Sequence, residues 1–216
     1  MHKRRVLEIC LDEIEAGATG ARGKGRAAHV LAARLIWPRP AIAEKVSLKT
    51  VDLQGGKADL NAAIWGRRIL FKETVQGPCG LSIEVTRRVS DTQAARFIHF
   101  LYASVFTALS AEVAATAPGG GWVGLLRQPL RFLARETGTP PKAWPAVMAA
   151  GMLDVRPESI GKRGERVQIE IPLRAPKDVF ETHRRQRGGE TAMRRERVRK
   201  AGEANGRAVI SIAAYD

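Results

Sequence analysis

The stretch "GATGARGKGR", residues 17–26, combines four glycines with three cations and contains no acidic residue. Glycine-rich loops bind nucleotide phosphates through their backbone amides, and a lysine adds charge. The pattern G-x-x-x-x-G-K-[ST] is broken twice here, because Ala18 occupies the first glycine position and Gly25 replaces the hydroxyl residue that binds magnesium. We therefore expect a connection between two strands. The alternative is a basic loop that contacts a polyanion without sequence preference, through Arg22, Lys24 and Arg26.

The same stretch also fits the dinucleotide-binding pattern G-x-G-x-x-[GA], as "GKGRAA" over residues 23–28. That pattern binds a pyrophosphate only where a strand ends at the first glycine and a helix begins after the last. The preceding strand is expected to end near Ile14, and no alternation of strand and helix follows it. Nucleotide binding is therefore the weaker alternative, and no cofactor is predicted.

Residues that could perform catalysis are few and scattered. The four histidines show no paired spacing, and no H-E-x-x-H, C-x-x-C or G-x-S-x-G motif occurs. The acidic side chains of Asp12, Glu13 and Glu15 could bind a metal, but a solvated strand end is the preferred interpretation, and no metal is predicted. A nucleophile pair of Cys10 and His29 would require folding to bring the two together.

A basic amphipathic helix is predicted over about residues 122–136, in "GWVGLLRQPLRFLARE". Arginines spaced by four form a cationic stripe beside an apolar face that includes Trp122, and Pro129 should kink the helix. Such a helix is typical of an anionic membrane surface. The alternative is a helix packed on the core with its arginines in water. The residues predicted to bind the anionic surface are Trp122, Arg127, Arg131 and Arg135.

A second basic run, "HRRQRGGETAMRRERVRKAGEANGR", carries nine Arg or Lys residues against three acids. A partly helical, solvated segment is the ordinary interpretation of residues 177–205. The alternative is binding to phosphates, which would make affinity fall with salt concentration. The run contains no aromatic residue on which a base could stack. Its candidate phosphate-binding residues are Arg184, Arg185, Arg187, Arg194 and Arg195.

The net charge of +14 is not confined to either run. Residues 1–40 carry +4, residues 41–90 carry +3, residues 91–176 carry +3 and residues 177–216 carry +4. A charge of this size attracts polyanions. We therefore expect an anionic partner, which could be an acidic lipid surface, a nucleic acid or an acidic protein.

The hydrophobic pattern predicts strands at both ends of the chain and helices between them. Period-two alternation indicates a strand at 5–14, a three-stranded meander over 58–88 with a hairpin turn at 66–67, and late strands at 166–174 and 207–215. Helical patterns cover 91–116, 122–136 and 143–153. The predicted fold is a single α+β domain, residues 1–216, built as an antiparallel β-sandwich or bent sheet with a helical insertion at 91–153.

The leading functional hypothesis is a non-enzymatic interaction protein that docks a basic surface on an acidic membrane or an acidic protein. A nucleic-acid-binding protein that contacts the phosphate backbone is the second hypothesis. An enzyme with a site assembled from distant residues is the third.

Cys10 and Cys79 are expected to be free thiols, and no signal peptide is apparent in "MHKRRVLEICLDEIE". These features favour the cytoplasm, with peripheral attachment to a membrane as the alternative.

Overall fold

The computed structural model describes residues 4–18, 26–38, 44–87, 146–161, 164–187 and 190–215, and most of these residues are in β-strands. The helical elements among them are α1 (Trp65–Arg68) and one 3-10 turn, Pro157–Ser159. The strands are β1 (Arg4–Ala16), β2 (Arg26–Ile36), β3 (Lys45–Gln54), β4 (Lys57–Asp59), β5 (Ile69–Gln76), β6 (Cys79–Thr86), β7 (Val147–Val155), β8 (Arg166–Arg174), β9 (Val179–Arg187), β10 (Glu190–Arg199) and β11 (Ala204–Tyr215).

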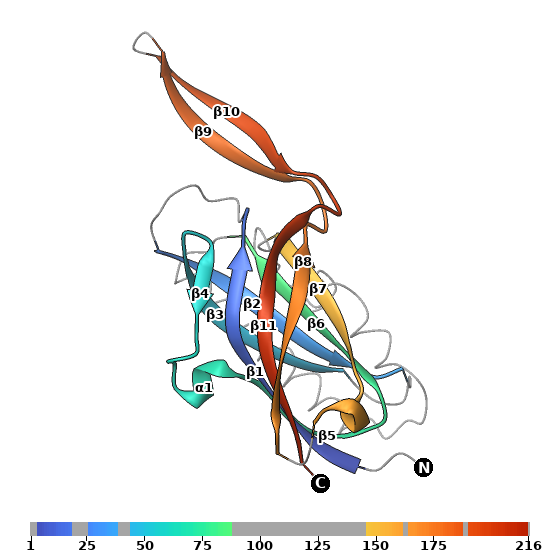
Figure 1. Ribbon diagram of the computed structural model, residues 1–216. Coiled ribbons are helices and arrows are strands. Elements are labelled where there is room, and N and C mark those ends of the chain that lie inside the picture. The colour runs from blue at the N-terminus through green and yellow to red at the C-terminus, as the bar shows by residue number, and fades with distance from the viewer. Residues whose placement is uncertain are drawn as a thin grey trace, which may run out of the picture.

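Eight of these strands form a closed antiparallel barrel (Figure 1). Their order is β11-β8-β7-β6-β2-β3-β4-β1, and β1 closes the barrel by pairing with β11 from Val6↔Tyr215 to Ala16↔Gly206. The short strand β4 covers only one end of β1, and β5 pairs along the other end of β1. Closure removes the exposed edges that an open sheet would leave.

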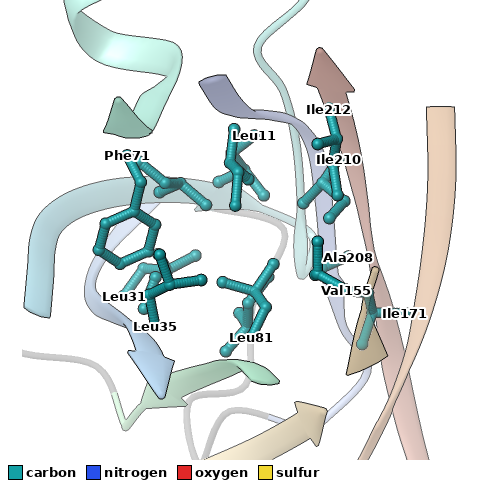
Figure 2. Close-up of a cluster of buried hydrophobic side chains, with 14 of the residues drawn as sticks. Leu11, Leu31, Leu35, Phe71, Leu81, Val155, Ile171, Ala208, Ile210 and Ile212 are labelled. Carbon is teal, nitrogen blue, oxygen red and sulfur yellow. The ribbon is translucent and has the colours of Figure 1, made fainter. Parts of the chain in front are cut away.

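The interior of the barrel is filled by aliphatic side chains that alternate along the strands (Figure 2). Leu7, Ile9 and Leu11 of β1 are fully buried. A bulge at Asp12 then shifts the alternation, so that Ile14 is the next buried residue of the core. Each fully buried Leu or Ile stabilises the fold by about 1.5–3 kcal/mol. Buried side chains from other strands include Leu31, Leu35, Phe71, Leu81, Ile171, Ile210 and Ile212.

The predicted α+β sandwich with a helical insertion is wrong, because the described residues form a closed β-barrel. The end of the expected insertion, 143–153, contains most of strand β7, which is paired with β6 on one side and β8 on the other. Its alanines and methionines favour helices, but pairing within the sheet overrides that preference. Gly151 fits this position because an added Cβ would lie 2.6 Å from the carbonyl oxygen of Pro172.

The predicted meander over 58–88 is also wrong. Gly66 and Arg67 lie in α1 and not in a hairpin turn. Strands β5 and β6 follow each other in sequence, but β5 pairs with β1 while β6 pairs with β2 and β7. The strands predicted near the two ends of the chain are confirmed as β1, β8 and β11.

Two of the predicted helices, 91–116 and 122–136, lie entirely outside the described residues. No amphipathic helix is found among the residues that the structure describes. Within the same residues, no helix is long and apolar enough to cross a membrane.

Candidate nucleic-acid interface

The most distinctive basic feature of the structure is a two-stranded ribbon formed by β9 and β10. Figure 1 shows that this ribbon extends away from one end of the barrel. It contains three arginines in β9 and four in β10, against the three glutamates Glu181, Glu190 and Glu196. The segment 177–205, which the sequence led us to expect as partly helical, is therefore largely a β-hairpin.

The ribbon is attached to the barrel by a small apolar cluster at its base. Val179, the first residue of β9, is fully buried against Ala18, Met148 and Ala175, and Val198 of β10 packs beside them. Burial of these apolar side chains stabilises the packing of the ribbon's base against the barrel. We infer that the base of the ribbon is held in one orientation relative to the barrel.

Asn205 connects this base to two other parts of the chain. Its buried side-chain amide donates to the carbonyl oxygens of Ala18 (3.0 Å) and Met148 (2.8 Å), and its side-chain oxygen accepts from the amide of Ala18 (2.8 Å). Segments 19–25 and 88–145 both adjoin this region, because one follows Ala18 and the other ends just before Ala146, whose carbonyl accepts from Arg87 (2.6 Å). Asn205 thus holds Ala18 and Met148 together beside the base of the ribbon.

Asp178 links the two strands at the base of the ribbon, where β9 begins and β10 ends. Its carboxylate accepts from the backbone amide of Ala201 (2.9 Å) and from the guanidinium of Arg197 (3.2 Å). The amide hydrogen bond and the Arg197 hydrogen bond hold the pKa of Asp178 below its ordinary value of 3.8. The carboxylate therefore stays ionised at neutral pH and offsets part of the charge of Arg197.

Seven cations of the barrel wall and of α1 are paired with carboxylates. Arg207 contacts Glu170 (2.6 Å) as well as Glu13 and Glu15, and the hydrogen bond to Glu170 raises its pKa. These pairs compensate part of the positive charge of the wall. The other wall pairs are Arg26–Asp52, Arg34–Glu84, Lys45–Glu73, Lys57–Glu15, Arg68–Asp12 and Arg166–Glu8.

The structure brings together five of the eight candidate phosphate-binding residues on the ribbon. Strand β9 carries Arg184, Arg185 and Arg187, and β10 carries Arg194 and Arg195. Arg26 begins β2 and is paired with Asp52. The remaining candidates lie outside the described residues: Arg22 and Lys24, together with the predicted surface-binding residues Trp122, Arg127, Arg131 and Arg135.

Sequence reasoning missed several residues that shape this interface. The guanidinium of Arg195 lies 4.1 Å above the centre of the Phe180 ring, and Phe180 had no assigned role. Neither Asp178 nor Asn205 was singled out. One signal was available, since Gly188 and Gly189 between two alternating runs are typical of a two-residue hairpin turn.

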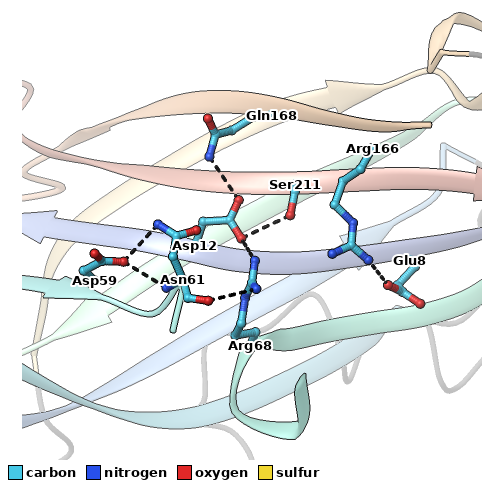
Figure 3. A network of polar contacts seen from close by, with 8 residues as sticks. All are labelled: Glu8, Asp12, Asp59, Asn61, Arg68, Arg166, Gln168 and Ser211. Carbon is cyan, nitrogen blue, oxygen red and sulfur yellow. Dashed lines mark hydrogen bonds and ion pairs between the residues drawn. The ribbon is translucent and has the colours of Figure 1, made fainter. Parts of the chain in front are cut away.

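A buried polar cluster lies elsewhere, on the wall of the barrel (Figure 3). The carboxylate of Asp12, only 2% exposed, accepts from Arg68, from Ser211 (3.1 Å) and from Gln168 (3.2 Å). Next to it, Glu8 accepts from Arg166 (2.6 Å). The expectation that Asp12 lies at a solvated strand end is therefore wrong. Among the described residues, no group of three or more His, Cys, Asp or Glu side chains is arranged to bind a metal.

The structure separates Cys10 and His29. Cys10 lies in β1 and His29 in β2, which are not neighbours in the barrel, and His29 Nδ1 lies 2.9 Å from the carbonyl oxygen of Thr86. Burial, and then the charge of Glu8, raise the pKa of the Cys10 thiol. A thiol with a raised pKa is a poor nucleophile. The proposed pair of Cys10 and His29 is therefore not assembled.

We expect both cysteines to resist alkylation in the folded protein. Both are buried, and burial raises the pKa of Cys79 to about 11, so very little reactive thiolate is present at about pH 8. Iodoacetamide should label neither thiol in the native protein and both in denaturant, as measured by intact mass. Rapid labelling of the native protein would show that the strands carrying these thiols open readily.

Comparison with known proteins does not assign the chain to a family. No protein-family model matches it, and no curated protein matches it in sequence. The function must therefore be argued from the chemistry of the interface.

Proposed function

We propose that this protein is a non-enzymatic binding protein that docks its β9–β10 ribbon on the phosphate backbone of a nucleic acid. The observation that carries the proposal is the concentration of arginine on a projecting two-stranded ribbon, while seven of the cations of the barrel are paired with carboxylates. Arginine binds phosphate through two parallel N–H donors. A two-stranded β-ribbon is also one of the elements that nucleic-acid grooves admit.

The pairing of charges favours the ribbon over the barrel wall as the surface that binds phosphates. Arg195 is exposed and has no carboxylate partner among the described residues. An unpaired guanidinium on a surface can bind a phosphate without first breaking an ion pair. Binding of this kind releases counterions from the nucleic acid, which makes it depend strongly on salt.

The ribbon is less suited to a membrane surface, the partner that the sequence placed first. Peripheral attachment needs an apolar face that enters the acyl boundary, together with the cations. Met193 is the exposed large apolar side chain of the ribbon among those that the structure describes, at 72% exposure. One methionine buries too little area for such an anchor. We therefore propose a nucleic acid as the partner, and the experiment below also measures binding to acidic vesicles.

The test compares R194Q/R195Q with the matched double variant R67Q/R156Q. Arg67 and Arg156 are exposed, and both lie away from the ribbon, in α1 and after β7. Both variants remove two positive charges. Fluorescence anisotropy would measure affinity for a labelled random-sequence duplex across a salt series.

We expect the wild-type protein to bind with a steep salt dependence. In R194Q/R195Q the slope of log affinity against log salt should fall by about one for each arginine that contacts a phosphate. The matched variant should keep the wild-type slope. A wild-type protein that binds acidic vesicles but no nucleic acid would overturn the proposal in favour of a membrane role. Equal losses in the two variants would show that only net charge matters.

A further inference from the structure

We propose that the two faces of the ribbon differ in function, and that one of them binds the backbone of a nucleic-acid duplex. This inference rests on the proposed function and adds the binding face and the form of the nucleic acid. In an antiparallel ladder, directly opposed residues belong to the same face, and successive residues alternate between faces. The observed register therefore assigns every position of β9 and β10 to one face.

All three glutamates of the ribbon fall on one face. That face, here called the acidic face, contains the opposed positions Glu181↔Glu196, His183↔Arg194, Arg185↔Ala192 and Arg187↔Glu190. Three arginines there are matched in number by three glutamates. A phosphate backbone that approached the acidic face would meet both signs of charge at similar density, and like charges would oppose its binding.

The opposite face carries arginine without any acidic residue. Here called the acid-free face, it contains the opposed positions Phe180↔Arg197, Thr182↔Arg195, Arg184↔Met193 and Gln186↔Thr191. Its three arginines are accompanied by neutral residues only, namely Phe180, Thr182, Gln186, Thr191 and Met193. The shift in register between Arg197 and Arg199 ends this alternation at the base of the ribbon.

The base of the ribbon determines which face is turned outward there. Val179 and Glu181 lie on the same side of β9, and both are buried, at 0% and 8% exposure. The acidic face is therefore turned toward the barrel at the base. On the other side, Arg195 and Arg197 are exposed to solvent. At the base, the acid-free face is therefore the one turned away from the barrel.

Contacts on the acid-free face hold its arginines in place. The guanidinium of Arg195 stacks on Phe180 at 4.1 Å, and Arg197 is hydrogen-bonded to Asp178 at 3.2 Å. Stacking fixes the plane of the Arg195 guanidinium while leaving N–H donors at its edge for a phosphate. Because Asp178 offsets the charge of Arg197, Arg195 is the exposed arginine of this face with no carboxylate partner among the side chains that the structure describes.

The same stacking favours a duplex over a single strand. Single-stranded nucleic acid is commonly bound by aromatic rings on which bases stack. Arg195 covers the ring of Phe180, which is the aromatic side chain of the ribbon. A duplex needs no such platform, and its major groove, about 12 Å wide, admits a two-stranded ribbon. The acid-free face therefore fits the phosphates that flank a duplex groove.

The experiment compares R195Q with R194Q. These arginines are adjacent on β10 and both exposed, and each variant removes one charge, but they lie on opposite faces of the ribbon. We expect R195Q to weaken binding to a labelled duplex about tenfold, because one charge-assisted hydrogen bond is lost. R194Q should change the affinity less than about twofold. Thermal unfolding of both variants would confirm that each is folded.

The outcomes separate this inference from the proposed function. Equal weakening by R194Q and R195Q, in a protein that still binds the duplex with a steep salt dependence, would overturn the two-faced ribbon and leave the proposed function in place. A single-stranded probe bound as tightly as the duplex at equal salt would overturn the choice of a duplex. A wild-type protein that binds neither probe would overturn the proposed function and this inference together.

Discussion

The Gly206→Ala substitution is expected to lower the free energy of unfolding by at least about 4 kcal/mol, or to prevent folding. Gly206 lies opposite Ala16, where β11 closes the barrel against β1, and its φ of +124° is one that residues with a side chain rarely adopt. A Cβ at this position would lie 2.6 Å from the carbonyl carbon of Glu15 and closer still to the carbonyl oxygen. Because backbone atoms cannot rotate away, β1 and β11 would have to separate.

Gly202→Ala is the matched control for this prediction. Gly202 also has a positive φ, +82°, but an added Cβ would meet nothing within 4 Å. Its substitution should cost only the conformational strain, about 1–2 kcal/mol. Urea unfolding of the two variants would separate the strain from the clash. A similar decrease in the free energy of unfolding for both variants would mean that β1 and β11 can move apart at position 206 without loss of stability.

The second large effect is expected from Asp12→Ala, which should lower the free energy of unfolding by about 3–5 kcal/mol. The Asp12 carboxylate is the common acceptor for Arg68, Ser211 and Gln168. Its removal leaves the guanidinium of Arg68, only 19% exposed, without its ion pair. The cost comes mainly from this uncompensated charge and from two unsatisfied donors.

Two comparisons test that explanation of the Asp12 effect. Asp52→Ala breaks the pair with Arg26, whose side chains are 42% and 72% exposed, and should cost no more than about 1 kcal/mol. The double variant D12A/R68L should lose less than the sum of the two single variants, because the second change removes the stranded charge. Additive losses in urea unfolding would contradict a coupled pair.

The sequence was sufficient to identify strands where one face alone is buried. Alternating Leu7, Ile9 and Leu11 predicted β1, and Ile169, Ile171 and Leu173 predicted β8. It was not sufficient to show that the sheet closes. Alternation indicates that a face is buried, but a barrel and a sandwich bury their faces with the same pattern. Closure depends on pairing β1 with β11, residues at opposite ends of the described chain.

The sequence identified the arginines of the candidate site but not the β-ribbon that carries them. The arginine run suggested phosphate binding, yet its many Arg, Glu, Met and Ala residues also suggested a helix. The two faces of the ribbon could not have been assigned from the sequence, because a slip of one residue in register would exchange them. The register depends on the turn after Arg187 and on burial of Val179 at the base.

The long segment 88–145 departs from β6 and returns in β7, and these two strands are adjacent in the barrel, with Thr86 opposite Val147. The two strands on either side of this sequence are therefore connected as in a β-hairpin. In general, the entropic cost of joining two adjacent strands grows only with the logarithm of the connection's length, by about 0.6 kcal/mol for each doubling. The pairing of β6 with β7 should accordingly tolerate connections of very different length. The barrel should therefore remain closed when the sequence between these two strands is lengthened, shortened or exchanged.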